Sequence, residues 1–321
     1  MSLKSAAAAA CVALAAALPA LAEIDAPECV APAQPGGGFD LTCRIAQQGL
    51  DGAFDRPIEV TFMPGGIGAV AFNQFNTTRT DDSNAIVAFS SGSLLNIATG
   101  KFGTFTENDV RFLATAGADY GAVIVRADSP YADLGALMDA FKADPGSVVV
   151  GAGGSVGSQD WMKGALLLKS VGADPRQMRY VAYDGGGDAI AGLLGGAIQV
   201  YTGDVGEMAA HIGDGSMRIL AVLAPERLEP PFDAYPTAKE LGYDTEWTIM
   251  RGFYMGKNVP DADYQAWADA FAAAYKTEAY RQARESKGLM PLELSGPEMD
   301  AQVKQLIGEL RDIARDAGLI Q

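Results

Sequence analysis

The sequence contains a single histidine, His211, and only three cysteines in 321 residues. It has no Cys-x-x-Cys pair, so the pattern that usually builds zinc sites is missing. Basic residues are also scarce, because 24 Lys and Arg stand against 40 Asp and Glu, which gives a formal net charge of −16. A surface of this charge repels nucleic acid and anionic membranes. We therefore expect no metal, no cofactor and no nucleic-acid partner.

Long apolar runs are absent after the N-terminus. There, Lys4 precedes the apolar run Ala6 to Leu18, and the small-residue pattern Ala20-Leu21-Ala22 stands just before Glu23. This order is typical of a secretory signal peptide. The run is short for a membrane span, which needs about 20 apolar residues. We expect cleavage near Ala22 and export to the periplasm, with an uncleaved N-terminal anchor helix as the alternative.

Removal of the signal peptide, which contains Cys11, leaves Cys29 and Cys43. Disulfides persist outside the cytoplasm, so a Cys29–Cys43 bridge is our first interpretation. It would close a loop of about 15 residues and stabilise the fold by roughly 3 kcal/mol in the chain-entropy model. A metal site is the rival interpretation, but the chain offers few further ligands for one.

Short β-branched runs alternate with Ala- and Leu-rich helical stretches from end to end. Such alternation is typical of βαβ units around parallel sheets, so the predicted fold class is α/β. The predicted strands are Glu28–Ala31, Ile58–Met63, Asn84–Phe89, Val123–Arg126, Ser147–Gly151, Arg179–Tyr183, Gln199–Tyr201, Ile219–Ala224 and Gly252–Met255. The predicted helices are Leu41–Leu50, Leu134–Ala143, Gln159–Val171, Asp188–Gly195, Val205–His211, Asp261–Thr277 and Pro297–Ala317.

About 300 mature residues exceed an ordinary domain of roughly 100–200 residues, so we expect two lobes, each a mainly parallel sheet flanked by helices. After the signal peptide, residues 1–22, we assign 23–125 to the first part of lobe 1 and 126–248 to lobe 2. Residues 249–321 return to lobe 1. Such a chain crosses between the lobes twice, as in binding proteins that close around a ligand.

Four glycine-rich clusters follow predicted strands and precede or open helical segments: Pro35–Asp40, Pro64–Gly68, Gly151–Ser158 and Gly185–Asp188. Bare backbone amides at a helix N-terminus favour an anion, and ligands of open α/β sheets bind at these ends of the strands. The simpler interpretation is that glycine merely permits tight turns. No cluster has the spacing of a phosphate loop or of the dinucleotide-binding motif, so we do not expect a nucleotide.

A secreted serine hydrolase is the alternative function. Gly153 to Gly157 matches the Gly-x-Ser-x-Gly pattern with Ser155 as nucleophile, and Asp204 and His211 follow in the order found in α/β-hydrolases. However, His211 falls in a predicted helix rather than on a loop. Asp40 also has a simple structural interpretation as the N-cap of the helix Leu41–Leu50. We therefore favour binding over catalysis.

Taken together, the glycine clusters and their neighbours resemble the solute receptors of tripartite tricarboxylate transporters, the Bug-type family, over essentially the whole mature chain. The residues that carry this resemblance are Pro35–Asp40 with Arg44, Phe62–Gly68, Gly151–Ser158, Tyr183–Gly187 with Leu193–Gly196, and Tyr235–Gly242. Three positions depart from the family pattern: Met63 before Pro64, Ile67 within the glycine run, and Gln159 where many members carry histidine.

The resemblance implies a Venus-flytrap receptor in the periplasm whose opposed loops hold a ligand carboxylate by backbone amides, hydroxyls and ordered waters, without an obvious cationic clamp. We expect a monomer that delivers its ligand to the membrane subunits of such a transporter. A di- or tricarboxylate such as citrate is our first candidate, ahead of aromatic carboxylates and acidic amino acids. Ser155 and Ser158 are expected to donate to the ligand, and Asp204 to receive a hydroxyl or amine. The predicted ligand-binding residues are Gly37, Gly38, Phe39, Asp40, Gly65, Gly66, Ser90, Ser155, Ser158, Gln159, Tyr183, Gly186 and Asp204.

Overall fold

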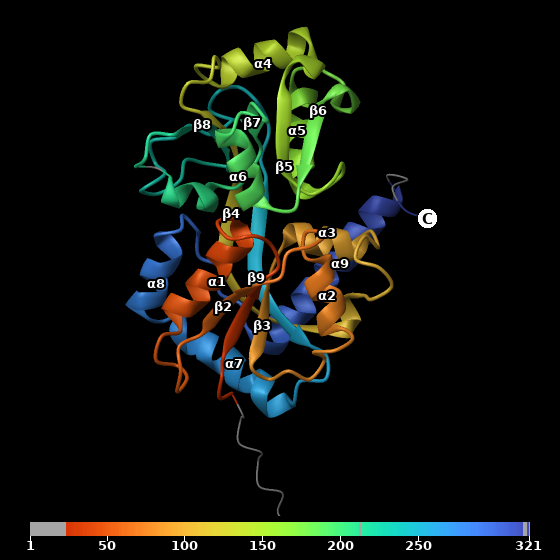
Figure 1. The fold of residues 1–321 in the computed structure, drawn as a ribbon, viewed down its shortest axis with the longest axis vertical. Coiled ribbons are helices and arrows are strands. Elements are labelled where there is room, and N and C mark those ends of the chain that lie inside the picture. Colours follow the sequence, from red (N-terminus) through yellow and green to blue (C-terminus); the bar gives the residue numbers. More distant parts are fainter. Residues whose placement is uncertain (1–23, 212, 317–319, 321) are drawn as a thin grey trace, which may run out of the picture.

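The computed structural model describes residues 24–211, 213–316 and 320, and shows two lobes stacked end to end (Figure 1). The predicted signal peptide lies outside the described residues. The α/β class is confirmed, because strands and helices alternate and helices cover the sheets. No helix in the described ranges is long and apolar enough to cross a membrane.

The first lobe contains both ends of the described chain. Its strands lie in the order β2-β1-β3-β9-β4, in which β1 pairs in parallel with β2 and β3, whereas β9 is antiparallel to β3 and β4. The strands are β1 (Glu28–Ala31), β2 (Glu59–Phe62), β3 (Ala85–Ser90), β4 (Val110–Arg126) and β9 (Thr248–Gly256). The helices are α1 (Gly38–Gly49), α2 (Ala69–Phe75), α3 (Ser91–Ala98), α7 (Asp261–Ala274), α8 (Glu278–Glu285) and α9 (Gly296–Asp316), with the short 3-10 helix η1 (Glu107–Asp109).

The second lobe is built around the parallel strands β6, β5 and β7, and β7 and β8 both pair antiparallel with β4. Its strands are β5 (Val149–Gly153), β6 (Arg179–Tyr183), β7 (Val200–Tyr201) and β8 (Met217–Leu223). Its helices are α4 (Leu134–Ala143), α5 (Gln159–Ser170) and α6 (Gly186–Leu194), with the 3-10 helices η2 (Pro145–Ser147), η3 (Pro175–Gln177) and η4 (Val205–Ala210).

Strand β4 belongs to both lobes. It pairs with β9 from Val110 to Tyr120 and with β8 from Gly121 to Arg126, so its partner changes where the lobes meet. Figure 1 shows β4 and β9 passing side by side between the lobes. The sequence pattern predicted only Val123–Arg126, because the earlier part of the strand is rich in Ala and Gly, which have low β propensity. Its burial in the sheet overrides that propensity.

Other differences from the predicted elements have local causes. Helices α2, α3 and α8 were not predicted, since they have seven or eight residues and give a short periodic signal. The segment predicted as a helix to His211 is the 3-10 helix η4, which ends at Ala210. Helix α1 begins at Gly38, before the predicted Leu41, and its N-cap is Gly37 rather than Asp40.

Each lobe has apolar cores on both faces of its sheet, as expected for a sheet covered by helices. In the first lobe one core contains Trp267 and Phe271, and the other contains Phe72 and Phe112. The second lobe is packed in the same way, around Tyr201 and Phe232 on one face and around Phe141 and Leu168 on the other. These packed cores hold the ends of the strands, and the turns that follow them, in fixed positions.

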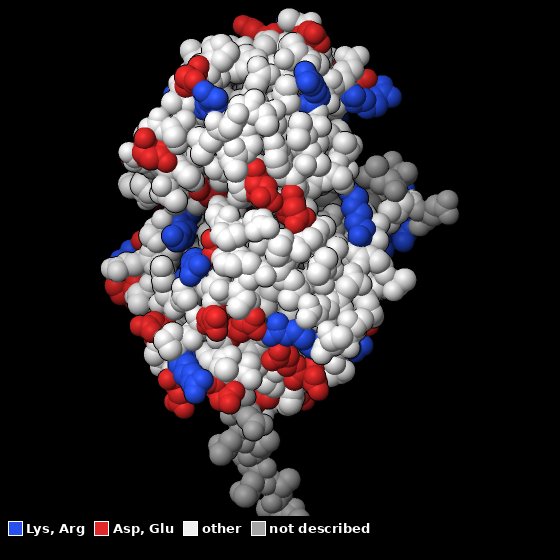
Figure 2. All heavy atoms as spheres, viewed as in Figure 1, with Lys and Arg blue, Asp and Glu red and all other residues white. Residues whose placement is uncertain are grey.

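The predicted disulfide is confirmed. Cys29 on β1 and Cys43 on α1 are bonded, with their Cα atoms 5.5 Å apart, and both are fully buried. The bond ties the strand before the first glycine turn to the helix after it. Surface charge is also as expected, since the face drawn in Figure 2 shows acidic side chains scattered over both lobes and only small, separate groups of basic ones.

Replacing both cysteines tests the contribution of the disulfide. We expect Cys29→Ala/Cys43→Ala to lower the free energy of unfolding by about 2–4 kcal/mol, because the unfolded chain regains the entropy that the loop removes. Urea denaturation of the double variant and of the reduced wild-type protein would measure this loss. Equal stability of oxidised wild type and double variant would contradict it.

Candidate functional site

A small inner cavity lies between the two lobes and has a volume of about 40 Å³. Seven predicted ligand-binding residues line it: Gly38, Phe39, Ser90, Ser158, Gln159, Gly186 and Asp204. The other lining residues are Ala33, Ile67, Gly92, Asn96, Gly153, Asp160, Gly185, Glu207 and Arg251. Residues that are far apart in the sequence therefore meet at one place. Seven of the sixteen come from the four glycine-rich clusters: Gly38, Phe39, Ile67, Gly153, Ser158, Gly185 and Gly186.

Four helices direct their N-termini at this inner cavity. Their N-caps are Gly37 for α1, Ser90 for α3, Ser158 for α5 and Gly185 for α6, two from each lobe. Each helix follows a strand of its own sheet, so all four starts lie at carboxyl ends of strands, where α/β proteins bind ligands. The first N–H groups of a helix have no partner within it, and its dipole is positive at this end. The arrangement favours an anion in the cavity.

Glycine is required where the turns of the two lobes meet. A Cβ atom on Gly37 would lie 2.9 Å from the backbone nitrogen of Gly187, and one on Gly187 would lie 2.2 Å from the carbonyl oxygen of Pro35. Both distances are too short for a real Cβ contact. The first lobe therefore touches the second backbone to backbone, beside the cavity.

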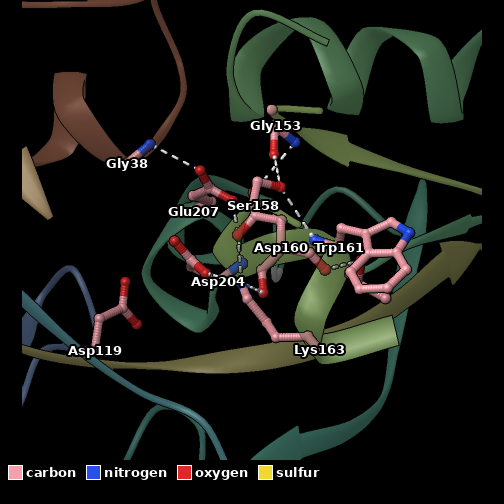
Figure 3. A network of polar contacts seen from close by, with 12 residues as sticks. Gly38, Asp119, Gly153, Ser158, Asp160, Trp161, Lys163, Asp204 and Glu207 are labelled. Atoms are coloured by element: carbon pink, nitrogen blue, oxygen red, sulfur yellow. Dashed lines mark hydrogen bonds and ion pairs between the residues drawn. The ribbon is translucent and has the colours of Figure 1, made fainter. Parts of the chain in front are cut away.

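Behind the cavity lies a buried network of charges that the sequence reasoning missed. The Arg251 guanidinium Nη2 lies 2.7 Å from Asp119 Oδ2 and 2.6 Å from Asp204 Oδ2. The Lys163 ammonium pairs with Asp204 and lies 2.7 Å from Asp160 Oδ1, as seen in Figure 3. All five residues are at least nine-tenths buried. Lys163 also donates to the Gly203 carbonyl oxygen at 2.8 Å.

This network corrects two expectations. A cationic group does stand at the cavity, because Arg251 is part of its wall. A detectable signal was present in the sequence, namely an arginine within an otherwise apolar strand. Asp204 lines the cavity as predicted, but Lys163 and Arg251 already engage its two oxygens. Burial opposes ionisation of this group, yet these two cations lower the pKa of Asp204.

Glu207 of the second lobe holds the first glycine turn. Its Oε1 accepts from the Gly38 N–H at 2.8 Å, across the lobe contact (Figure 3), and its Oε2 accepts from the Asp204 N–H at 3.2 Å and from the Tyr201 hydroxyl. Burial, together with the charge of Asp204, raises the pKa of Glu207 to about 8. Burial likewise raises the pKa of Asp160 to about 6. Burial therefore favours the uncharged form of Glu207 to a higher pH than in an ordinary glutamic acid, which weakens the negative charge that it places beside the helix N-termini.

A second, wider cleft of about 470 Å³ adjoins the inner cavity and shares Ile67, Asn96 and Ser158 with it. Three further predicted residues, Gly66, Ser155 and Tyr183, line this outer cleft. Its other lining residues are Lys101, Phe102, Gly154, Ala182 and Asp184.

Ile67 lines both spaces. Its φ of 53° lies in the left-handed region, which a β-branched residue rarely adopts. Its N–H donates to Asp184 Oδ1 of the other lobe at 3.2 Å. Ile67 therefore combines a strained backbone with a polar contact between the lobes.

The remaining predicted residues line neither space. Gly37 lies at the lobe contact described above. Gly65 is in the left-handed region and packs on Val70, since a Cβ there would lie 2.5 Å from a Val70 methyl carbon. Asp40 accepts from the Gly36 N–H at 2.8 Å and pairs with Arg44 at 3.1 Å, so it stabilises the first turn.

The two serines that were predicted to donate to the ligand differ in whether the protein already engages their hydroxyl groups. The Ser158 hydroxyl donates to the Gly153 carbonyl oxygen at 3.0 Å and accepts from the Trp161 N–H, so its hydrogen is already used within the protein (Figure 3). Ser155 is exposed at the outer cleft. Ser155 therefore lines the outer cleft and not the inner cavity.

The hydrolase alternative is contradicted by the pairing of its three residues. The His211 Nδ1 atom lies 3.0 Å from Asp214 Oδ2, and Asp204 is taken by Lys163 and Arg251. Without a histidine supported by Asp204, Ser155 has no general base. No cluster of potential metal-binding side chains occurs in the described parts of the chain.

The buried charges generate a stability prediction. Lys163→Met leaves Asp160 and Asp204 without their shared cation, and we expect it to lower the free energy of unfolding by about 3–5 kcal/mol. Arg176→Met, which removes an exposed partner of Asp174, serves as the matched control and should change stability very little. Urea denaturation of both variants at pH 7 would measure the difference, and equal losses would contradict it.

A second prediction concerns pH. The native protein binds a proton at Glu207 up to about pH 8, whereas the unfolded chain loses it near the ordinary value of 4.5. The stabilising contribution of this group is thus complete below pH 4.5 and is lost as pH rises towards 8. We expect the free energy of unfolding to fall less between pH 6.5 and 8.5 in Glu207→Gln than in wild type. Parallel curves from urea denaturation would refute this role of Glu207.

Comparisons with known proteins agree with the geometry. Among curated sequences, the chain is 25% identical over 249 residues to a protein from the gbd 5' region of Cupriavidus necator, covering 77% of this chain and 74% of the relative. It is 26% identical over 217 residues to protein BugT of Bordetella pertussis, covering 67% and 65%.

Solved structures show the same fold. The periplasmic binding protein BugD superposes with a TM-score of 0.79 at 20% identity, covering 91% of this chain and 97% of that one. MatC from Rhodopseudomonas palustris with bound malate gives a TM-score of 0.76 at 20% identity, covering 91% and 98%. An R. palustris protein with adipate gives 0.78 at 18% identity, covering 91% and 97%.

The sequence profile described as "Tripartite tricarboxylate transporter family receptor" matches residues 42–321, which is most of the chain. The family consists of substrate-binding receptors rather than enzymes. The sequence motifs that resemble this family include the glycine turns that line the cavity. This protein therefore belongs to the tripartite tricarboxylate transporter receptor family.

Proposed function

We propose that the protein is a periplasmic receptor that captures a small organic dicarboxylate or tricarboxylate and delivers it to the membrane subunits of a tripartite transporter. The observation that carries this proposal is the convergence of four helix N-termini, two from each lobe, on one cavity between the lobes. Each terminus favours negative charge. An uncharged ligand would gain little from the positive electrostatic field of these helix N-termini.

The inner cavity has a size that suits one carboxylate group. At about 40 Å³ it has room for about three water-sized groups, and a carboxylate has three heavy atoms. Backbone dipoles act more strongly at such a site, which protein surrounds on several sides, than in open water. The overall negative charge of the protein opposes binding there less than its size suggests, because the nearby Asp119, Asp160 and Asp204 carboxylates are paired with Lys163 and Arg251, and burial favours the uncharged form of Glu207.

Structural neighbours support a dicarboxylate ligand, since one is described with malate and another with adipate. Citrate is our first tricarboxylate candidate. We assign the ligand contacts to the inner cavity and the outer cleft. Backbone amides of the α1, α5 and α6 N-termini surround one carboxylate, except those of Gly38 and Trp161, which Glu207 and Ser158 already engage, and the Ser155 hydroxyl is a further donor. Asp204 acts through Lys163 and Arg251 in this assignment, and not as a direct acceptor.

We further propose that the lobes close on the ligand about β4 and β9. The first lobe then comprises residues 23–125 and 249–321, and the second comprises 126–248. The chain works as a monomer in the periplasm after removal of its signal peptide. Closure brings the glycine turns of the two lobes into the backbone contact seen at Gly37 and Gly187.

A thermal-shift screen across organic acids tests the binding function. A ligand that binds only the native protein stabilises it, by about 2.7 kcal/mol when its concentration is 100 times Kd. We expect malate, succinate, adipate or citrate to raise the melting temperature, and amides of the same acids to have no effect. A flat response to every carboxylate would overturn the proposal.

A steric variant tests closure. Gly37 has an ordinary extended backbone, φ −97° and ψ −176°, so alanine fits there locally, but its Cβ would press on the Gly187 turn of the other lobe. We expect Gly37→Ala to raise Kd about tenfold or more, since overpacking of a close contact costs about 1–3 kcal/mol.

Gly308→Ala on α9 is the control, because a Cβ at Gly308 would meet no atom within 4 Å. Calorimetric titration with the acid found in the screen would measure both Kd values. Unchanged affinity in Gly37→Ala would rule out closure through this contact.

A further inference from the structure

The outer cleft contains a cation without a counter-ion. Lys101 lines this cleft next to Phe102. It lies in the first lobe, shortly after α3 ends at Ala98. In the part of the chain that the structure describes, no carboxylate forms an ion pair with Lys101 and no side chain accepts a hydrogen bond from it. Asp184 lines the same cleft, but it accepts from the Ile67 N–H and does not pair with Lys101.

The second lobe faces this cation with a glycine turn. A Cβ on Gly157 would lie 3.5 Å from Nζ of Lys101, so the turn before α5 passes directly beside the ammonium group. Ser155 in the same turn is exposed and also lines the cleft. Although the Lys101 side chain is still open to solvent, the surrounding protein lowers the pKa of Lys101 by desolvation. A charge that is partly desolvated and unpaired gains most from an anion placed beside it.

Asn96 connects the outer cleft to the inner cavity, which it also lines. It is largely buried, and no hydrogen bond engages its side-chain amide among the described residues. A ligand that reaches from one space to the other would pass Asn96 and could bind its amide. The inner cavity itself has room for only about one carboxylate, so the rest of a larger ligand must extend into the outer cleft.

We propose that the outer cleft is the subsite for the second anionic group of the ligand, with Lys101 as its counter-ion and Ser155 as a neighbouring donor. This inference rests on the proposed carboxylate-binding function and sharpens it. The receptor then selects for a ligand with two separated anionic groups, one at the helix N-termini and one at Lys101. Selectivity between diacids and monoacids is located at one side chain of the first lobe.

The test compares ligands that differ by one charge. Calorimetric titrations of the full mature protein use succinate against butanoate and adipate against hexanoate, which are matched in carbon number. In wild type we expect the diacid of at least one pair to bind at least about tenfold more tightly than its monoacid. In Lys101→Met we expect the affinity for that diacid to fall about tenfold, while the affinity for the monoacid changes less than about twofold.

Lys169→Met is the matched control, because Lys169 is exposed in the last turn of α5, at the opposite end of that helix from the cleft. It should leave every Kd unchanged. Lys101→Arg keeps the charge and should retain most of the preference for the diacid. Circular dichroism and melting temperature without ligand establish that all variants fold.

The outcomes separate the two proposals. Binding of diacids with equal affinity to wild type and Lys101→Met would overturn the role of Lys101 and leave the receptor function intact. An equal loss for the diacid and the monoacid would also overturn it, because Lys101 would then not recognise the second charge. If no acid of either class binds wild type, the proposed function itself fails, and the inference fails with it.

Discussion

Asp204 joins two buried cations, and the placement of the cavity walls depends on this pairing. Lys163 comes from α5 of the second lobe and Arg251 from β9, which runs between the lobes. Bringing these charges out of water is costly, and only close pairing offsets the cost. The network therefore fixes where α5 starts and where β9 passes the first glycine turn. A Cβ on Gly38 would lie 2.2 Å from the Arg251 guanidinium, so that turn lies directly on the network.

The network also explains how an acidic protein can present an attractive site for an anion. Two cations, Lys163 and Arg251, offset most of the charge of the three paired carboxylates, and burial raises the pKa of Glu207, which favours its uncharged form. Glu207 already takes the Gly38 N–H and the Ser158 hydroxyl takes that of Trp161, so the positive field at the cavity comes from the remaining N-terminal amides of the four helices. The net charge is distributed over the outer surface, where it affects solubility and the rate at which the ligand meets the protein. The local field at the cavity is set mainly by backbone dipoles.

The sequence was informative where structure follows from local pattern. The α/β class, most strand positions and the disulfide between Cys29 and Cys43 could be predicted, because each depends on composition or short-range periodicity. Glycine turns after strands marked seven of the residues around the inner cavity. The Ala- and Gly-rich half of β4 was missed, since its pairing with β9 rather than its propensity makes it a strand.

The charge network could not be predicted in the same way. Arg251 and Asp119 are 132 positions apart, and Lys163 and Asp204 are 41 apart, so only the folded chain reveals that they meet. A charged side chain inside an apolar strand or on the apolar side of a helix was the available signal. Such a pattern indicates that the charged side chain has a partner of opposite charge in the fold, but it does not identify that partner. Lys101 gave no signal at all, because an exposed lysine in a loop is ordinary in any sequence.

The contact between the two glycine turns has a consequence for how receptors of this shape diversify. Gly37 and Gly187 meet through backbone atoms alone, whereas the contacts of Gly38 with Glu207 and of Ile67 with Asp184 join the lobes through side chains. A side chain added at either glycine would meet fixed backbone, whereas the side chains that line the outer cleft can vary without entering this contact. Lobe closure and ligand selectivity thus depend on different parts of the molecule.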